Sequence, residues 1–435
     1  MRHKFLISLI ALGVLTISAT NKGLSQPNFW QQMSNGLSNL NVSALSVDSN
    51  GTLYAATGSY FPVVFRSTDN GDSWDSAGQT DGSSINCLET NSRGYIFAGD
   101  VFYGVYRSTD SGNMWVRVDS GLTNPLVRAL AINSSGDIFA GILPVYIDTN
   151  FFYGIYRSTN NGDNWVQVNT GLRYGAGIYS FATNSAGQIF AGGSYGIYRS
   201  TDNGSNWVES NNGLDSNRYV SSISVGPNGH IFAGTQDSGI YRSTDDGNTW
   251  THANIVLPNL TVVWSLVINS LGHIFAAVSQ STFSYGVLRS TDDGINWTLV
   301  NSGFTTSATV YDLVINSSGY VFAGTGGGGV FRSVQSTTSV EQIDHELPTA
   351  FSLKQNYPNP FNPSTSIQFS VPRTEFVTLK IYNILGKDVA TLVSKNLSAG
   401  TYETEWNAQG FPSGVYFYRL QAGAFIQIKK LILIR

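Results

Sequence analysis

Short runs of apolar and β-branched residues, separated by Gly, Asn, Asp and Ser, recur along most of the chain. One repeat unit shows the pattern, because four of its segments favour strands: Val127–Asn133, Asp137–Gly141, Gly154–Ser158 and Trp165–Val168. The turn between the first two strands ends in glycine in every unit, as a left-handed turn residue requires. These glycines are Gly51, Gly94, Gly136, Gly187, Gly229, Gly272 and Gly319. The pattern predicts four antiparallel strands per unit and an all-β fold.

A motif at the end of each third strand fixes the length of the repeat. Ser-Thr-Asp-x-Gly-x-x-Trp occurs at Ser67–Trp74, Ser108–Trp115, Ser200–Trp207, Ser243–Trp250 and Ser290–Trp297. A sixth copy, Ser158–Trp165, has Asn160 in place of the aspartate. An arginine precedes each serine, and successive arginines lie 41 to 50 residues apart: Arg66, Arg107, Arg157, Arg199, Arg242, Arg289 and Arg332. Four antiparallel strands at this spacing are typical of the blades of a β-propeller.

The seventh unit lacks its fourth strand, and the missing strand is found at the other end of the repeat region. Trp30–Leu37 has the same form as Trp115–Leu122. We therefore expect Trp30–Met33 to pair with Gly329–Ser333 and to close a seven-bladed ring, which removes the open edge between the chain ends. We also expect the propeller to be complete by Val334.

The repeats resemble the Asp-box, or BNR, repeats of sialidases, of xyloglucan-type glucanases and of photosystem-assembly-factor-like propellers. The resemblance covers about residues 30–334 and implies the propeller fold. Because unrelated activities share these repeats, the resemblance does not define a reaction.

The last ninety residues carry a different set of motifs. They are Asn356–Pro363 (Asn-Tyr-Pro-Asn-Pro-Phe-Asn-Pro), Ile381–Gly386, Gly414–Arg419 and a basic ending at Lys429-Lys430. Strands are expected at Ser366–Val371, Val377–Asn383 and Val415–Leu420, in a small β-sandwich. The segment resembles the type A C-terminal sorting domain of the type IX secretion system. The resemblance implies the type IX secretion machinery as a partner, a bacterium of the Bacteroidetes kind, and a protein that is secreted or held at the outer-membrane surface.

The N-terminus reads as a secretory signal peptide, because the charged residues Met1–Lys4 precede a short apolar run from Phe5 to Ile17. The expected order is a signal peptide in residues 1–25 (cleaved after 19 or 25), a propeller in 26–334, a linker in 335–346 and the sorting domain in 347–435. No later apolar stretch is long enough to predict a transmembrane helix after signal cleavage.

Composition and charge exclude some partners. Between Trp30 and Val334 there are 12 arginines, no lysine and 21 acidic residues, a balance of −9. Such an acidic body argues against nucleic acid and anionic lipid as ligands. The single cysteine, Cys87, excludes an intrachain disulfide.

A glycoside hydrolase needs two carboxylates across a cleft. The aspartates and arginines that recur in every repeat are interpreted as structural, so the candidates are the acids outside the motif: Asp312, Asp100, Asp148 and Asp237. Asp312 is the most suggestive, because the matching slot otherwise holds Ala44, Cys87, Ala129, Ser180, Ser222 and Ser265. His230 and His273 share a variable slot that we interpret as solvated, and the pattern predicts no metal site and no cofactor.

The differences between blades point instead to a binding surface. Loops between second and third strands, together with the starts of the first strands, share the face opposite the motif turns. They carry Tyr60, Phe61, Phe102, Tyr103, Arg128, Tyr146, Phe152, Tyr153, Tyr179, Tyr195, Trp264, Phe283, Tyr285 and Tyr311. Exposed aromatic rings suit stacking on sugars or a protein interface; alternatively, these rings pack on one another and cover the blades.

The sequence thus predicts an exported, non-catalytic propeller that binds carbohydrate or a surface protein. The alternatives are a secreted sialidase- or glucanase-like glycoside hydrolase and an envelope assembly factor.

Overall fold

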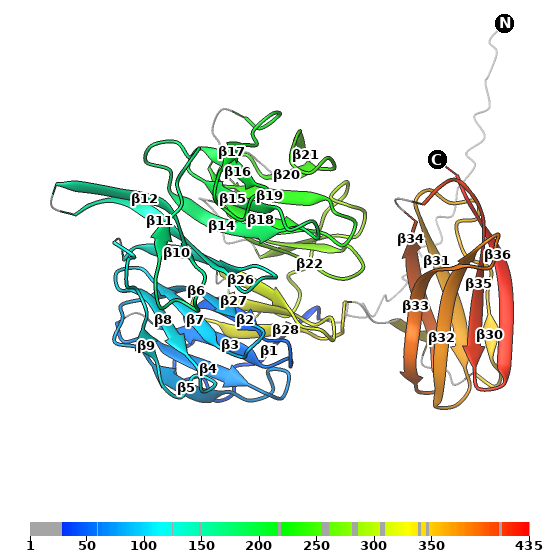
Figure 1. Cartoon of the computed structure of the whole chain (residues 1–435). Helices are drawn as coiled ribbons and strands as arrows, with labels where there is room; N and C mark the ends of the chain where they lie inside the picture. Colours follow the sequence, from blue (N-terminus) through cyan, green and yellow to red (C-terminus); the bar gives the residue numbers. More distant parts are fainter. Residues whose placement is uncertain are drawn as a thin grey trace, which may run out of the picture.

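The computed structural model describes residues 28–434, except residues 59, 124, 148, 216–218, 254–260, 281–285, 305–308, 338–340, 345–347 and 409–410. The described part contains strands and no helix, in nine four-stranded antiparallel sheets (Figure 1). Seven sheets form the blades of a propeller, as predicted, and two form the C-terminal sandwich. The expected signal peptide lies outside the described residues.

Each blade is a meander whose first strand lies innermost, against the central channel. The first three blades contain β2 (Val42–Val47), β3 (Leu53–Thr57), β4 (Val63–Ser67), β5 (Asp75–Gln79); β6 (Ile85–Thr90), β7 (Ile96–Asp100), β8 (Gly104–Ser108), β9 (Val116–Arg117); and β10 (Val127–Ile132), β11 (Ile138–Ile147), β12 (Asn150–Ser158), β13 (Val166–Gln167). The next three contain β14 (Ile178–Thr183), β15 (Ile189–Gly193), β16 (Gly196–Ser200), β17 (Val208–Glu209); β18 (Val220–Val225), β19 (Ile231–Thr235), β20 (Ile240–Ser243), β21 (Thr251–His252); and β22 (Thr261–Ile268), β23 (Ile274–Gln280), β24 (Val287–Ser290), β25 (Thr298–Leu299). The seventh contains β26 (Val310–Ile315), β27 (Val321–Thr325), β28 (Gly329–Ser333) and, from the N-terminus, β1 (Trp30–Gln32).

The N-terminal strand closes the ring, which confirms the prediction. β1 pairs antiparallel with β28, with Trp30 opposite Ser333 and Gln32 opposite Phe331. The Trp30 indole is buried, stacks on Phe304 at 5.0 Å and donates its N–H to the carbonyl of Val300. The same bond, from the motif tryptophan to the end of the preceding blade's outer strand, recurs at 2.5–2.9 Å in all seven blades. The tryptophan slot therefore joins each blade to the one before it.

The motif aspartate holds a turn, as the repetition suggested. Asp110 Oδ1 accepts bonds from the Ser108 hydroxyl (2.8 Å) and from the backbone N–H of Met114 (2.9 Å). Asn160 accepts the equivalent two bonds in its own turn, at 2.9 and 3.0 Å. The residue after each aspartate is left-handed and the glycine that follows also has a positive φ, so the turn needs a residue without a Cβ there.

The repeated arginines join each blade to the next. Six of them donate Nη1 to the backbone carbonyl of the left-handed residue in the next blade's motif turn, at 2.6–3.1 Å. Arg332 in blade seven reaches Asn70 in blade one and so bonds across the point of closure. Arg289 is the exception, because blade seven has no motif turn; its Nη2 lies 3.2 Å from His273 Nδ1.

The chain that follows β28 fills the place of this missing turn. In blades two to five and in blade seven, an Asn side chain bonds to the left-handed residue of the neighbouring motif turn, as Asn91 does with Asn161. In blade six, Asn269 donates instead to the carbonyl and hydroxyl of Thr337, at 3.1 and 3.2 Å. The Thr337 N–H donates to the carbonyl of Gly319 at 2.7 Å. The propeller's contacts thus extend three residues beyond Val334, where the sequence predicted its end.

Blade three differs from the others by its length. We expected a loop between Gly141 and Gly154, but β11 and β12 continue through it and pair as far as Ile147 and Asn150. Apolar and aromatic residues alternate here along both strands, which suits a hairpin. The resulting arm projects from the propeller beyond the other blades (Figure 1).

The C-terminal sandwich has its own core. Its sheets contain β29 (Glu341–Asp344), β34 (Gly400–Asn407), β31 (Ser364–Val371), β30 (Ser352–Leu353) and β33 (Asp388–Leu397), β32 (Glu375–Asn383), β35 (Gly414–Ala422), β36 (Phe425–Leu433). Its buried cluster runs from Leu353 to Leu433 and shares no residue with the propeller clusters. Because β29 pairs with β34, part of the expected linker is a strand of this sandwich.

Candidate binding site at the mouth of the central channel

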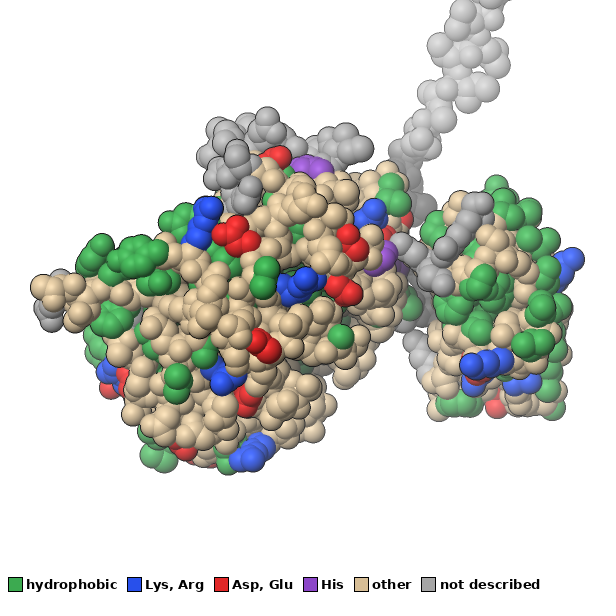
Figure 2. Space-filling model, turned by 45° about the horizontal axis from the view of Figure 1, so that its top comes forward, with side chains coloured by type: hydrophobic (Ala, Val, Ile, Leu, Met, Phe, Trp, Pro, Cys, Tyr) green, Lys and Arg blue, Asp and Glu red, His purple; other side chains and the backbone are tan. Residues whose placement is uncertain are grey.

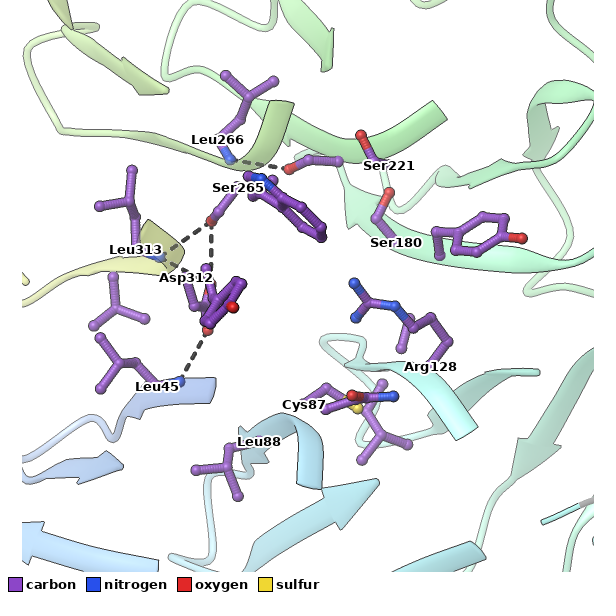
Figure 3. A pocket seen from close by; sticks show the side chains of 18 of the residues that line it. Leu45, Cys87, Leu88, Arg128, Ser180, Ser221, Ser265, Leu266, Asp312 and Leu313 are labelled. Carbon is purple, nitrogen blue, oxygen red and sulfur yellow. Dashed lines mark hydrogen bonds between the residues drawn. The ribbon is translucent and has the colours of Figure 1, made fainter. Parts of the chain in front are cut away.

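Every innermost strand has a β-bulge near its start. The strand pairing skips one residue in each blade: Ser43, Asn86, Arg128, Tyr179, Ser221, Trp264 and Tyr311. A bulge redirects a side chain that would otherwise alternate with its neighbours. All seven bulged residues line one cavity of about 510 Å³ in the central channel (Figure 3). We call these seven residues the bulge ring; four of them, Arg128, Tyr179, Trp264 and Tyr311, were expected on this face from the sequence.

The next residue of each strand forms a second ring of mostly small side chains. Three of them accept a hydrogen bond from a backbone N–H of the following blade. Each of these N–H groups belongs to the second residue after a bulged residue. Ser222 Oγ accepts from Leu266, and Ser265 Oγ accepts from Leu313. Asp312 Oδ2 accepts from Leu45 at 2.9 Å, across the junction of blades seven and one. Asp312 therefore occupies the place of a capping serine, as the dashed bonds of Figure 3 show.

Asp312 and Glu89 form a pair of perturbed acids in the channel. Burial raises the pKa of Asp312 to about 6, while hydrogen bonds from Leu45, Ser265 and Leu313 oppose the rise. Burial, together with the negative charge of Asp312, raises the pKa of Glu89 to about 8. Both residues line the channel cavity, and the surrounding strands leave both of them half-buried.

Glu89 was not among the acids predicted from the sequence, although it meets the criterion that singled out Asp312. Glu89 follows Cys87 by two residues, so both side chains point to the channel. The matching positions hold only Ser46, Ala131, Ala182, Ser224, Val267 and Val314. A lone acid among small and apolar residues was the signal that singled out Asp312.

Most members of the bulge ring contact a neighbouring residue. Ser43 and Ser221 donate to the carbonyls of Ile85 and Val263, and Asn86 donates to Val127. Tyr179 lies 4.3 Å from Tyr219 between ring centroids. Trp264 meets Tyr311 edge to face at 5.7 Å and donates its indole N–H to Ser279. The mouth therefore presents two fixed aromatic pairs.

Further aromatic residues stand on the same face, in the loops between second and third strands. Tyr60 is 83% exposed and Phe61 is 61% exposed, although both have a left-handed backbone. Bulky residues rarely adopt this conformation, and such strain is concentrated at functional sites. Their N–H groups donate to the carbonyls of Ser83 and Gly82, which fixes the turn. Phe102, Tyr103 and Tyr195 are also exposed.

The arm of blade three carries a separate aromatic cluster. Phe151 lies 4.5 Å from Tyr146, 5.7 Å from Tyr153 and 5.1 Å from Tyr174. Figure 2 shows hydrophobic side chains gathered along this arm. Tyr146 and Tyr174 remain about two-thirds exposed, whereas Phe152 packs against the core of its blade. Some of the predicted aromatic side chains are thus exposed, and others pack on one another or on the blade.

Of the remaining candidate acids, Asp100 and Asp237 do not line the cavity with Asp312. Asp100 is buried, and its carboxylate accepts backbone bonds from Ser83, Ser84, Phe102 and Tyr103. This pattern is that of a residue that holds a loop. Asp237 is exposed in the loop between β19 and β20. Asp148, Phe283 and Tyr285 lie outside the described residues.

The histidine slot is less solvated than we predicted. His273 is buried beside Arg289 and Thr337, and burial and the Arg289 charge lower its pKa to about 4. His230 lies 2.9 Å from an Asp293 carboxylate oxygen. Neither belongs to a metal site: within the described ranges, no group of three or more His, Cys, Asp or Glu side chains could hold a metal ion.

Comparisons with known proteins agree with this two-part architecture. Residues 355–434 match the family model described as a secretion system C-terminal sorting domain, and residues 174–319 match that of the DUF6242 beta propeller domain. The sorting domain confirms the expected link to the type IX secretion machinery and the localisation of the protein, secreted or at the outer-membrane surface of a Bacteroidetes bacterium. No helix in the described residues is long and apolar enough to cross a membrane. A search of curated proteins found no match.

Several solved structures share the fold at low sequence identity. PorZ, a surface component of the type IX secretion system of Porphyromonas gingivalis, has a TM-score of 0.54 and 15% identity over 92% of this chain, which spans only 60% of the PorZ chain. YCF48 bound to D1 peptide has a TM-score of 0.55 and 15% identity, covering 73% of this chain and 98% of that one. An ancestral GH74 enzyme has a TM-score of 0.56 and 16% identity, covering 93% and 63%. At these identities the likeness shows the fold alone.

Proposed function

We propose that this chain is a non-catalytic recognition protein that binds carbohydrate at the mouth of its propeller channel, outside the cell. The observation that carries the proposal is the bulge ring, which turns seven side chains into one cavity, among them the aromatic residues Tyr179, Trp264 and Tyr311, each held by a ring contact. Exposed aromatics on the same face, such as Tyr60 and Phe61, extend this surface. Sugar rings stack on aromatic faces, which suits such a mouth. The sorting domain delivers the protein to a place where it meets extracellular polymers.

The test is a glycan-array screen of the full chain, followed by affinity measurements on each hit. Trp264→Ala combined with Tyr60→Ala should weaken binding about tenfold or more, because each stacked ring contributes ~0.5–1.5 kcal/mol beyond area burial. The matched control is Tyr357→Ala, which removes a tyrosine that is 81% exposed in the C-terminal sandwich. The proposal would be contradicted if the double variant bound the glycan as tightly as the parent chain, or if Tyr357→Ala lost as much affinity as the double variant. If the chain binds a protein and no glycan, the carbohydrate assignment is wrong and the ligand is a surface protein.

A glycoside hydrolase is the second candidate, because Glu89 and Asp312 are two acids with raised pKa values in one channel. Three hydrogen-bond donors already engage Asp312, so it is poorly placed to act on a substrate. Release of reducing ends from a bound oligosaccharide, abolished by Glu89→Gln and by Asp312→Asn alike, would favour this candidate over recognition alone.

A further inference from the structure

We infer that the ligand is an acidic carbohydrate, a sugar bearing a carboxylate, and that Arg128 is the residue that binds this carboxylate. The inference rests on the proposed function and names its ligand class. It starts from a difference within the bulge ring, in which Arg128 is the charged member.

Arg128 differs from the other six residues of the bulge ring in its contacts. The other six each make a hydrogen bond or a ring contact. Within the described ranges, the Arg128 guanidinium has no hydrogen-bond or ion-pair partner. Figure 3 shows its side chain extending from the wall into the open channel. A half-buried guanidinium without a partner is costly, so the site is built for an acceptor that arrives from outside.

The acids of the channel do not supply this acceptor. Asp312 accepts hydrogen bonds from Leu45, Ser265 and Leu313. The Arg128 charge helps to lower the pKa of Asp312, but the two side chains do not form an ion pair. Glu89 keeps its proton near neutral pH, since its pKa is raised to about 8. Arg128 therefore retains its charge without a direct counter-ion.

Other arginines of the propeller are committed elsewhere. Seven occupy the repeat slot between blades, Arg117 pairs with Asp119 and Arg173 pairs with Glu209. Arg93 lies in the turn between β6 and β7, on the opposite face, and Arg218 lies outside the described residues. Among the described residues, Arg128 is thus the cation at the mouth.

A sugar carboxylate fits this arrangement better than a peptide does. A guanidinium binds a carboxylate through two parallel N–H···O bonds, which fixes orientation as well as charge. The pairs Tyr179–Tyr219 and Trp264–Tyr311 offer ring faces for the sugar. A peptide would need backbone groups to pair with, but the N–H groups freed by the bulges, such as those of Leu45 and Leu266, are already capped.

The experiment compares affinities of the full chain for tetramers of uronic acids (galacturonate, mannuronate and guluronate) and for the carboxyl-reduced neutral tetramers. We expect at least one uronate tetramer to bind ten or more times tighter than its neutral form, and the preference to weaken as salt is raised. Arg128→Gln should abolish the preference, and Arg128→Lys should restore only part of it, because an ammonium lacks the planar fork. Arg93→Gln is the matched control and should behave as the parent chain. Melting temperatures verify that each variant is folded.

Two results separate this inference from the proposed function. If neutral tetramers bind as tightly as uronates and Arg128→Gln changes nothing, while Trp264→Ala still weakens binding, the carboxylate inference fails and recognition of carbohydrate stands. If no uronate tetramer binds, the inference also fails. If a peptide with a free C-terminal carboxylate binds, its amidated form does not, and Arg128→Gln removes the binding, then Arg128 recognises protein and the sugar class is wrong.

Discussion

In every aspartate of the repeated motif, Oδ1 accepts two hydrogen bonds within the turn, and the chain itself shows whether these bonds need a charge. Asn160 accepts the same two bonds as Asp110, without a charge. Where the second oxygen also accepts bonds, the charge has a further effect: hydrogen bonds from Ser73 and Asn206 lower the pKa of Asp69 and Asp202 to about 2. The charge therefore matters for acid stability more than for the shape of the turn.

We predict that Asp110→Asn leaves the melting temperature at pH 7 nearly unchanged, whereas Asp110→Ala lowers it, because only alanine removes the acceptor. Asp69 and Asp202 ionise near pH 2 in the folded chain and near ~3.9 when unfolded. Their contribution is complete above about pH 4 and is lost as the pH falls towards 2. Thermal melts across this range measure both effects. Equal losses from Asn and Ala at pH 7 would mean that the charge, and not the acceptor, holds the turn.

Glu89 should have the opposite dependence on pH. It ionises near pH ~4.3 in the unfolded chain and near 8 in the folded one. Between these values the unfolded chain releases a proton that the folded chain keeps, so stability declines as the pH rises. We predict that Glu89→Gln raises the melting temperature at pH 8 and has little effect at pH 4. Glu209→Gln, an exposed acid paired with Arg173, serves as the control for a general charge effect.

Single residues also show where sequence reasoning works. Positions that repeat in every blade could be assigned to the fold, because a ring of equal blades needs equal contacts. Departures from the repeat pointed to Asp312 and Arg128, and Glu89 was open to the same test. What the sequence could not give is the bulge: it is a property of strand register, and no residue type marks it here.

At the scale of strands, the ring closure was predictable because one blade lacked a strand and an unpaired segment of the same form existed. The arm of blade three was not predictable. Its residues are an insertion relative to the other blades, and the sequence does not show that β11 and β12 pair along it. The role of Thr337 was hidden for a different reason. It replaces a motif turn without resembling it in sequence, and only its bonds to Asn269 and Gly319 reveal the replacement.

This replacement predicts where the propeller can be shortened. A chain that ends at Gln335 leaves the buried Asn269 amide and the Gly319 carbonyl without their partners. Each such loss costs about 1–3 kcal/mol. We expect its melting temperature to be several degrees below that of a chain ending at residue 340. Thr337→Val in the full chain should show a smaller decrease, because the backbone bonds remain. Equal melting temperatures for the two shortened chains would restore Val334 as the end of the propeller.

At the scale of the whole molecule, the propeller and the sandwich have separate buried cores, and their sequence signals are equally distinct. Periodicity and motif spacing predicted the seven blades, and alternating strands with short turns predicted the sandwich. The ligand class could not be predicted from the sequence, because the residues of the bulge ring come from seven segments that are far apart along the chain.

Separate cores predict separate roles in the cell. Removal of residues 348–435 should leave the melting temperature of the propeller and its affinity for ligand unchanged. In the native host, the same shortened protein should accumulate in the periplasm, as cell fractionation would show. Display of this protein at the cell surface would contradict the role of the C-terminal domain in export.

The exit point of the chain has one more consequence. β28 ends at Ser333 on the side of the motif turns, while the bulge ring opens on the other side. In a molecule held to the cell by its C-terminal end, the chain thus leaves the propeller on the face opposite the channel mouth. If a polymer binds at the mouth, it pulls against that C-terminal attachment. That tension would enter through blade seven, where the pairing of β1 with β28, the buried Trp30 and the bonds of Thr337 together oppose the opening of the ring.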